Sequence, residues 1–292
     1  MSLDANALVT LAEAKTFLGI SDSDSDTLLQ TLINSSSTAI ESYTDRKFIE
    51  AEYKEFYNAT GQRRLRLRNY PVSQVNRVAY GSKLAFTVNS TVSTDLRTTV
   101  EIQDSQVQLE RHDSAGASTA TAISFSSNKT SSAIVNAINA VTGFSASLNT
   151  NCLAEDLYRN GGVSVVSSPA QIYFPDQDDT AYRLHEDRAT IEFIDSSDYA
   201  FFRTGSDMGI RLPRSFAGVK VEYKAGYGDV TAIPKDLKQA CLLSVQMLFN
   251  LSKKDPTVAS ESIGAYSYSN SFQYLTEDTV MKQLLAPYVD RK

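Results

Sequence analysis

Few side chains in this 292-residue sequence have the type and spacing of a catalytic site. The two histidines, His112 and His185, lie in no nucleophile or zinc motif. No G-x-S-x-G turn, Gly-Lys-Ser/Thr phosphate loop or dinucleotide fingerprint occurs in the sequence. Carboxylates are plentiful, but general acid–base chemistry depends on a geometry that the sequence does not give. We therefore expect the chain not to be an enzyme and to need no cofactor.

Two acidic runs carry oxygen atoms that a divalent cation could use. The run Asp176-Gln177-Asp178-Asp179 could ligate such an ion, although runs of this kind are more often hydrated loops. The alternating run of residues 21–26 lacks the central glycine and the final glutamate of a calcium-binding EF-hand loop. It suits the N-cap and acidic first turn of a helix instead. We expect no metal site, and a metal-dependent hydrolase built on residues 176–179 is kept as one alternative.

The charge, the cysteines and the hydropathy of the sequence limit the partners that the protein can bind. The formal net charge of −6 and the pI near 5.1 argue against a protein that grips duplex DNA through many phosphates. They do not exclude a surface that DNA slides past, because phosphates are repelled there rather than held. Cys152 and Cys241 have no metal-ligand spacing, so we expect two reduced thiols. No apolar run approaches the ~18 residues of a membrane span and no secretory signal is apparent, so we expect no membrane association.

One patch of the sequence is locally basic. Leu65 and Leu67 alternate with Arg64, Arg66 and Arg68, which predicts a strand with one buried and one charged face. With Arg63 the row contains four arginines. Such a row could contact a nucleic acid or an acidic partner. It could equally be a solvated or salt-bridged strand face, and the sequence leaves both interpretations open.

Helical spacing dominates both ends of the sequence. Thr10 and Glu13 have the spacing of a capping box, and Gly19 is suited to end the helix that they begin. A longer amphipathic helix follows and ends around residues 43–45, a third opens at Ile233-Pro234, and a fourth lies close to the C-terminus. The apolar stripes expected on the last three helices are Leu28, Leu32, Ser36, Ala39, Ile40 and Tyr43; Leu237, Cys241, Val245, Leu248 and Leu251; and Val280, Met281, Leu284 and Leu285.

Strand signals are fewer. Alternation predicts strands at residues 75–80, 190–194 and 219–223. Residues 86–185 are rich in Ser, Thr, Asn and Ala, and they contain a predicted hairpin across Asp104-Ser105 and a short helix starting at Ser131 or Ser132 and stopping at Gly143. We therefore predict an α+β protein. Residues 1–85 and 186–292 would form a discontinuous helical core of about four helices plus a small antiparallel sheet, and residues 86–185 a small α+β insertion domain.

Five blocks of the sequence follow one another in a characteristic order. The most specific is the strand Val221–Gly228, whose glycine turn runs into the proline-started helix Ile233–Ala240. The others are Leu8–Leu18 with its acidic linker, Ile40–Arg46, Leu67–Val72 with its Pro-Val turn, and Ser260–Tyr268. Together the five blocks resemble the gp6-like head–tail connector family of tailed phages, and they cover roughly residues 8–80 and 215–285. The middle hundred residues depart from compact members, although larger adaptors carry an insertion there with an element similar to Ile138–Phe144.

The resemblance implies a structural head-to-tail adaptor in the neck of a tailed bacteriophage. Its helical cores would pack side by side into a dodecameric ring under the portal. A head-to-tail interface gives a closed ring when the rotation between neighbouring copies adds up to a full turn. Double-stranded DNA would pass through the central channel without sequence-specific binding. The implied partners are further copies of the chain, the portal protein, and a downstream neck or tail protein such as a stopper or tail terminator. The protein would be made in the host bacterial cytoplasm and reside in the virion neck.

The family's usual arrangement places portal docking in the C-terminal stretch Ile263–Lys292, whose tyrosine-rich run suits ordering on a partner. The arginine row Arg63, Arg64, Arg66 and Arg68 is expected to face a neighbouring subunit, the portal or the DNA channel. The alternative function is a carbohydrate- or host-surface-binding module of the virion, based on the Ser/Thr/Asn-rich insertion. The candidate docking residues are Ile263, Tyr266, Tyr268, Phe272, Tyr274, Leu284, Leu285 and Tyr288.

Overall fold

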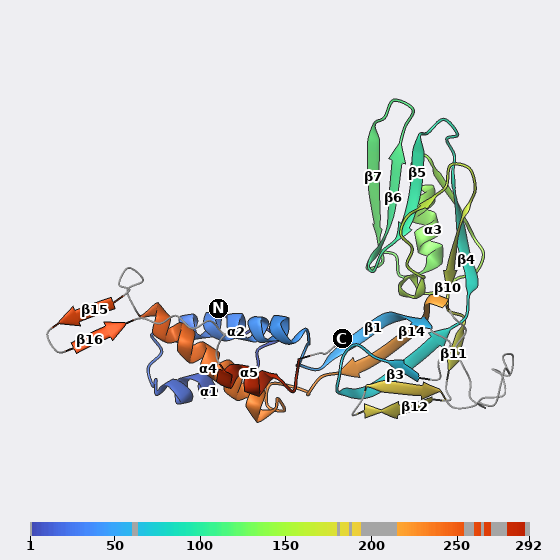
Figure 1. Cartoon of the computed structure of the whole chain (residues 1–292). Helices are drawn as coiled ribbons and strands as arrows, with labels where there is room; N and C mark the ends of the chain where they lie inside the picture. Colours follow the sequence, from blue (N-terminus) through green and yellow to red (C-terminus); the bar gives the residue numbers. More distant parts are fainter. Residues whose placement is uncertain are drawn as a thin grey trace.

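The computed structural model describes residues 2–59, 64–179, 182–186, 189–193, 215–253, 260–263, 266–269 and 279–289. Buried side chains within these ranges form three hydrophobic clusters. One cluster lies in a helical unit built from both ends of the chain, one in the central sheets, and one in the middle region, residues 83–174. The helical unit extends to one side of the central sheets and the middle region rises from their other end, so the chain has the outline of an L (Figure 1).

The helical unit consists of α1 (Leu11–Leu18), α2 (Asp26–Thr44), α4 (Lys235–Ser252) and α5 (Thr279–Leu285). Thr10 and Glu13 form the expected capping box, and Gly19 ends α1 in the left-handed conformation, so both predictions are confirmed. α2 and α4 pack through short polar side chains. The hydroxyls of Ser36 and Ser244 lie 2.9 Å apart, and those buried groups therefore satisfy each other at the helix contact.

The apolar stripe predicted on α2 is partly wrong. Leu28 and Tyr43, its two ends, are 39% and 41% exposed. Four of the seven buried residues are polar, and a search for hydrophobic periodicity does not detect such residues. Hydrogen bonds compensate their burial: Ser37 accepts from the Leu8 backbone N–H, and Thr44 donates to the Ile40 carbonyl. The buried residues of α2 are Leu29, Ile33, Ser36, Ser37, Ile40, Glu41 and Thr44.

Two antiparallel sheets form the centre of the molecule. The four-stranded sheet has the order β1 (Ala51–Ala59), β14 (Ser215–Ala225), β3 (Val72–Tyr80) and β11 (Gln177–Asp179). The three-stranded sheet has the order β12 (Tyr182–His185), β13 (Thr190–Phe193) and β2 (Arg64–Arg66). β3, β13 and β14 confirm the three strands predicted from alternation. Side chains of both sheets share one core, which includes Tyr57, Leu67, Val78, Ile191, Phe193, Val221 and Tyr223.

The middle region leaves the central sheet after β3 and returns at β11, which pairs with β3. Its exit and return points are therefore neighbours, which lets the sheet accept an insertion without disruption. The predicted hairpin is confirmed, and a short helix is present where it was expected: α3 (Ser131–Asn139) starts after the N-cap Thr130. Its predicted stop at Gly143 is wrong, because α3 ends at Asn139 with Ala140 as its C-cap. The strands of the middle region form two sheets. The three-stranded sheet has the order β10 (Ala170–Phe174), β4 (Lys83–Ser90) and β8 (Phe144–Leu148). The four-stranded sheet has the order β7 (Ser118–Ser124), β6 (Gln106–His112), β5 (Arg97–Ile102) and β9 (Val163–Ser164), and the 3-10 turn η1 (Ala154–Asp156) belongs to the same region.

The predicted fold class, a helical core with a small antiparallel sheet, is wrong. The described residues form sixteen strands in five antiparallel sheets but only five α-helices, so sheets dominate. Most missed strands lack clean alternation, because alternation requires one buried and one solvated face. β7, for example, reads STATAIS and is exposed along most of its length. The remaining sheet, the hairpin β15 (Ser260–Ile263) and β16 (Tyr266–Ser269), projects from the far end of the helical unit (Figure 1).

Candidate assembly surfaces

The arginine row lies on an exposed strand. Leu65 and Leu67 are buried, whereas Arg64, Arg66 and Arg68 are exposed, so the predicted alternation is confirmed. The guanidinium of Arg64 lies 3.6 Å from a carboxylate oxygen of Glu192, and Arg64 remains 62% exposed. Ion pairs this exposed are screened by water and contribute little to stability. The row therefore keeps positive charge at the surface; Arg63 lies outside the described residues.

A buried hydroxyl cluster holds the end of this strand against the central sheet. The hydroxyls of Tyr57 and Tyr223 lie 3.1 Å apart, and both donate to Glu55, at 2.5 and 2.6 Å. The backbone N–H groups of Arg68 and Asn69 donate to Tyr57 and Tyr223 in turn, at 3.1 and 3.2 Å. Burial is the main cause that raises the pKa of Tyr223 to about 12 and the pKa of Tyr57 further above its ordinary range. Both hydroxyls therefore stay protonated and fix the backbone that follows the arginines.

Sequence reasoning missed this cluster. Glu55 and Tyr57 lie on β1, and Tyr223 lies on β14, more than 160 residues away in sequence. Strand pairing brings them together, because Tyr57 lies opposite Val219 and Tyr53 opposite Tyr223 in an antiparallel register. A register of this kind is set by long-range pairing, so local alternation could not have revealed it.

The candidate docking residues fall into separate groups. Ile263 and Tyr266 are paired in the β15–β16 register, and Tyr268 lies on the same hairpin. Phe272 and Tyr274 lie outside the described residues. The remaining three, Leu284, Leu285 and Tyr288, pack against the core of the helical unit.

Leu284, Leu285 and Tyr288 make their contacts within the helical unit of the same chain. Leu285 is 4% exposed, and the ring of Tyr288 meets that of Phe48 edge-on with centroids 6.0 Å apart. The Tyr288 hydroxyl donates to Asp236 on α4 at 2.7 Å. α5 therefore stabilises the helical unit, which the docking hypothesis did not anticipate.

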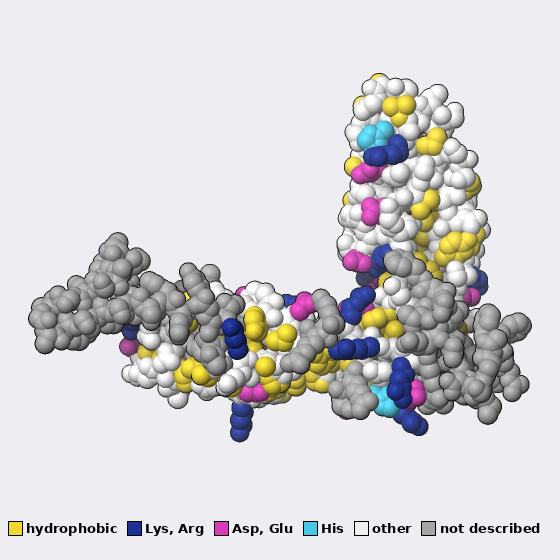
Figure 2. Space-filling view, viewed as in Figure 1, with side chains coloured by type: hydrophobic (Ala, Val, Ile, Leu, Met, Phe, Trp, Pro, Cys, Tyr) yellow, Lys and Arg dark blue, Asp and Glu magenta, His cyan; other side chains and the backbone are white. Residues whose placement is uncertain are grey.

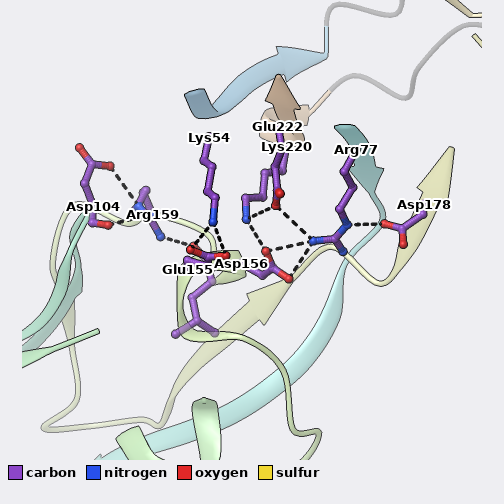
Figure 3. A network of polar contacts seen from close by, with 10 residues as sticks. Lys54, Arg77, Asp104, Glu155, Asp156, Arg159, Asp178, Lys220 and Glu222 are labelled. Carbon is purple, nitrogen blue, oxygen red and sulfur yellow. Dashed lines mark hydrogen bonds and ion pairs between the residues drawn. The ribbon is translucent and has the colours of Figure 1, made fainter. Parts of the chain in front are cut away.

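A network of ion pairs joins the middle region to the central sheet (Figure 3). Asp156 on η1 is 5% exposed and accepts from Arg77 on β3 at 3.0 and 3.2 Å. It also accepts from Lys220 on β14, whose side chain is 1% exposed. A buried charge is tolerated only where a partner compensates the lost hydration, so each of these groups depends on the others.

Further ion pairs surround this buried centre. Arg77 also pairs with Asp178 on β11 at 2.7 Å, and Lys220 lies 2.9 Å from Glu222. Burial alone would lower the pKa of Arg77, but hydrogen bonds to Asp178 and Asp156 outweigh it and raise the pKa overall. At the surface, Lys54 on β1 meets Glu155 at 2.8 Å, a hydrogen bond that raises the pKa of Lys54. The sheet thus supplies the cations and the middle region supplies Glu155 and Asp156.

The residues considered for catalysis are dispersed. His112 lies 2.8 Å from Arg97 at the far end of β6, and His185 lies 2.8 Å from Glu192 in the three-stranded sheet. In the acidic run, Asp178 is paired with Arg77. Within the described ranges, no three His, Cys, Asp or Glu side chains are grouped to hold a metal ion. None of the helices described is long and apolar enough to cross a membrane.

One cavity of about 530 Å³ opens on the middle region beside the ion-pair network. Its walls include Ser105, Phe125, Lys129 and Leu153, and Glu155 lies at its margin. Three separate loops supply these residues, which is why the sequence did not predict the cavity.

Residues 8–71 match the family model described as phage gp6-like head-tail connector protein. The match covers α1, α2, β1 and β2, and it confirms the resemblance to the head–tail connectors over that part of the chain. No curated protein matches the chain.

Solved structures also match at low identity. A chain in the neck of an empty GTA particle computed with C6 symmetry shares 15% identity at a TM-score of 0.43, covering 100% of this chain and 94% of that one. A chain in the virion of the native gene transfer agent (GTA) particle shares 16% at 0.42, covering 100% and 94%. A chain in the neck of the native particle computed with C12 symmetry shares 14% at 0.43, covering 100% and 93%. Likenesses this distant support no conclusion about the function of this chain.

Proposed function

We propose that the chain is a structural head-to-tail adaptor of a tailed bacteriophage. Copies of it form a dodecameric ring that binds the portal on one side and a downstream neck or tail protein on the other, and DNA passes through the channel. The observation that carries this proposal is the match of residues 8–71 to the head–tail connector family. A ring of this kind acts by shape and assembly, and no catalysis is proposed.

The surface of α4 supports assembly through the helical unit. Leu237, Cys241 and Val245 face the core of the unit and are fully buried. Leu242 and Leu243 are half-buried and pack against the same core, and Met247 is half-buried as well, so the apolar stripe of α4 is broad. A broad stripe leaves partly exposed apolar surface along its edges. Hydrophobic side chains also gather along the helical unit in Figure 2. Side-by-side packing of copies would cover them, and such heterologous contacts close into rings.

The mass of the purified protein tests the ring. Light scattering, with and without the portal, should give a mass near twelve 32.1-kDa chains, about 385 kDa, in at least one condition. Met247→Glu should reduce the mass to that of a monomer, because it places a charge in the proposed contact. Thr119→Glu adds the same charge to the exposed strand β7 and should leave the mass unchanged. A strict monomer in both conditions would refute the ring.

The portal-docking segment is proposed to be the stretch from Ile263 onward, which includes the end of β15 and the whole of β16. Isolated two-stranded hairpins are marginally stable in water, which favours a partner for the β15–β16 hairpin. Deleting residues 263–292 also removes α5 from the core, so Tyr266→Ser combined with Tyr268→Ser is the sharper test. The double variant should lose portal binding in a pull-down and keep its oligomeric mass. Leu285→Ala is the control for damage to the helical core, and unchanged portal binding by the double variant would remove this assignment.

The arginine row is proposed to face a neighbouring copy, the portal or the channel. The exposure of Arg64, Arg66 and Arg68 supports this, and the ion pairs of Arg64 and Arg68 are long and solvent-exposed. A ring carrying Arg66→Glu should fail in assembly, portal binding or DNA packaging, and the step that fails identifies the contact. Normal behaviour in all three assays would mean that the row is only solvated.

Residues 86–185 are proposed to fold as a separate insertion domain. The middle cluster of buried residues supports this, because all of its members lie between Ala85 and Phe174. A fragment of residues 82–175 keeps β4 whole and should unfold cooperatively by circular dichroism. A fragment without a cooperative transition would show that the region depends on the central sheet.

A further inference from the structure

Within the described residues, the middle region meets the central sheet at three places. The chain crosses once between β3 and β4, through Gly81, and once between β10 and β11, through Pro175 and Asp176. These crossings are packed closely, since a Cβ added at Gly81 would collide with the Asp176 carboxylate. The third contact is the η1 turn and the residues that follow it, which lie on the sheet without any chain connection at that point. Two crossings alone would allow rocking about the line that joins them, and the third contact opposes this.

Asp156 is the centre of the third contact. It receives hydrogen bonds from Arg77 and Lys220, which lie on the neighbouring strands β3 and β14. Both Asp156 and Lys220 are almost fully buried. Rotation of the middle region would separate the Asp156 carboxylate from both of its donors and would leave Lys220 with Glu222 alone, which is unfavourable for buried charges. A buried ion pair of this kind adds little net stability, but it favours one relative orientation over the others.

Tyr158 extends the contact toward the crossings. Its hydroxyl donates to the carbonyl of Gly81 at 2.5 Å and lies 3.2 Å from that of Gly218. Its ring meets Phe56 on β1 edge-on, with centroids 5.6 Å apart. Polar and aromatic contacts thus link η1 to β1, β3 and β14 together.

We propose that Asp156, Arg77 and Lys220 form an ionic lock that holds the middle region at one angle to the central sheet. The middle region is then a rigid arm and not a flexibly tethered module. This inference goes beyond the adaptor function and does not depend on it, since it concerns the single chain. The outer Lys54–Glu155 pair is 45% and 41% exposed and is screened by salt, whereas the buried centre is protected from screening. The angle is therefore insensitive to ionic strength.

Distance distributions between two spin labels test the lock. Gln74→Cys on β3 and Ser114→Cys in the turn between β6 and β7 place one label on the central sheet and one on the middle region, both at exposed positions. Cys241 is buried and Cys152 is half-buried, and burial raises the pKa of Cys152 to about 11 and that of Cys241 to about 12, which slows their reaction with the label. The labelled full chain, diluted with unlabelled chain, should give one narrow distribution, unchanged by added salt.

Two lock variants and one control complete the test. Asp156→Ala and Lys220→Met should each broaden or shift the distribution, while circular dichroism and the protection of the native thiols show that the chain is folded. Asp104→Ala removes an exposed ion pair with Arg159 that lies within the middle region, and it should leave the distribution unchanged. A broad distribution in the unmodified chain would overturn the rigid arm. A narrow, unshifted one in both lock variants would overturn the role of the ion pairs. A variant that fails to fold is replaced by Arg77→Met, which removes the second donor to Asp156.

Discussion

Replacing Tyr223 by Phe should loosen the arginine strand without disturbing the packing of the sheet. Tyr223 is fully buried at the centre of the hydroxyl cluster, and the ring that phenylalanine retains keeps the same neighbours. The lost hydroxyl donates to Glu55 at 2.6 Å and accepts from the Asn69 backbone at 3.2 Å. It is also within 3.1 Å of the Tyr57 hydroxyl and of the Asn69 side chain.

The cost follows from what these partners lose. Glu55 keeps its hydrogen bonds from Tyr57 and from the Asn69 side chain, so it loses one charge-assisted hydrogen bond of three. The Asn69 backbone N–H loses its acceptor in a part-buried position. A hydrogen bond to a charged group and one unsatisfied donor together correspond to about 2–4 kcal/mol of unfolding free energy. A loss of about 2 kcal/mol enlarges the fraction of molecules in which the arginine strand is open roughly thirtyfold.

Two measurements report this change. Denaturant unfolding should show the loss of stability, and trypsin should cleave the exposed arginine strand faster, because cleavage follows the population of the open strand. Tyr53→Phe is the matched control: Tyr53 stacks on Tyr223 at 5.4 Å, and its hydroxyl has no hydrogen bond within the described ranges. The control should stay within about 0.5 kcal/mol of the unmodified chain. If the two tyrosine variants behave alike, the cluster does not position the arginine strand.

Three further predictions concern single groups. Leu285→Ala should destabilise the helical unit by about 2–5 kcal/mol in denaturant unfolding, because Leu285 is 4% exposed, whereas Val280→Ala at a 54% exposed site of the same helix should cost little. The hydrogen bond from Arg111 lowers the pKa of Asp95, so the stability that the Asp95 carboxylate adds is present at neutral pH and is lost as the pH falls through the lowered pKa. Asp95→Asn should therefore flatten the acid side of a curve of unfolding free energy against pH. Cys152 and Cys241 should react slowly with a thiol reagent at pH 8 until the chain is denatured, and fast native reaction would contradict their burial.

Local signals predicted the helices and the amphipathic strands well. The capping box at Thr10, the left-handed Gly19 and the strand around Leu65 and Leu67 all depend on neighbours within a few residues, and the structure has them as expected. The helix after Pro234 was also predicted, although Pro234 is its N-cap and not part of its first turn. These features were predictable because local backbone geometry and one solvated face determine them.

Features that depend on a second layer of structure were not predictable. Residues 219–224 alternate apolar and charged, which indicates a solvated face, yet Lys220 on that face is 1% exposed. The η1 turn covers it, and the contact between residues 156 and 220 spans 64 positions in the sequence. The same reason explains the underestimated strand content, since strands buried on both faces or exposed on both faces show no period of two.

The ionic lock has a consequence for the proposed ring. Copies that assemble through the helical unit would display their middle regions at equal spacing, and a fixed angle would place all of them in register. A partner with matching symmetry could then bind every copy at once, without first paying the entropy of ordering flexible arms. Averaged electron-microscopy images of the ring should therefore show the middle regions as sharply as the central sheets. Rings carrying Asp156→Ala should show them blurred, and equally sharp middle regions in both rings would mean that neighbouring copies, not the lock, set the angle.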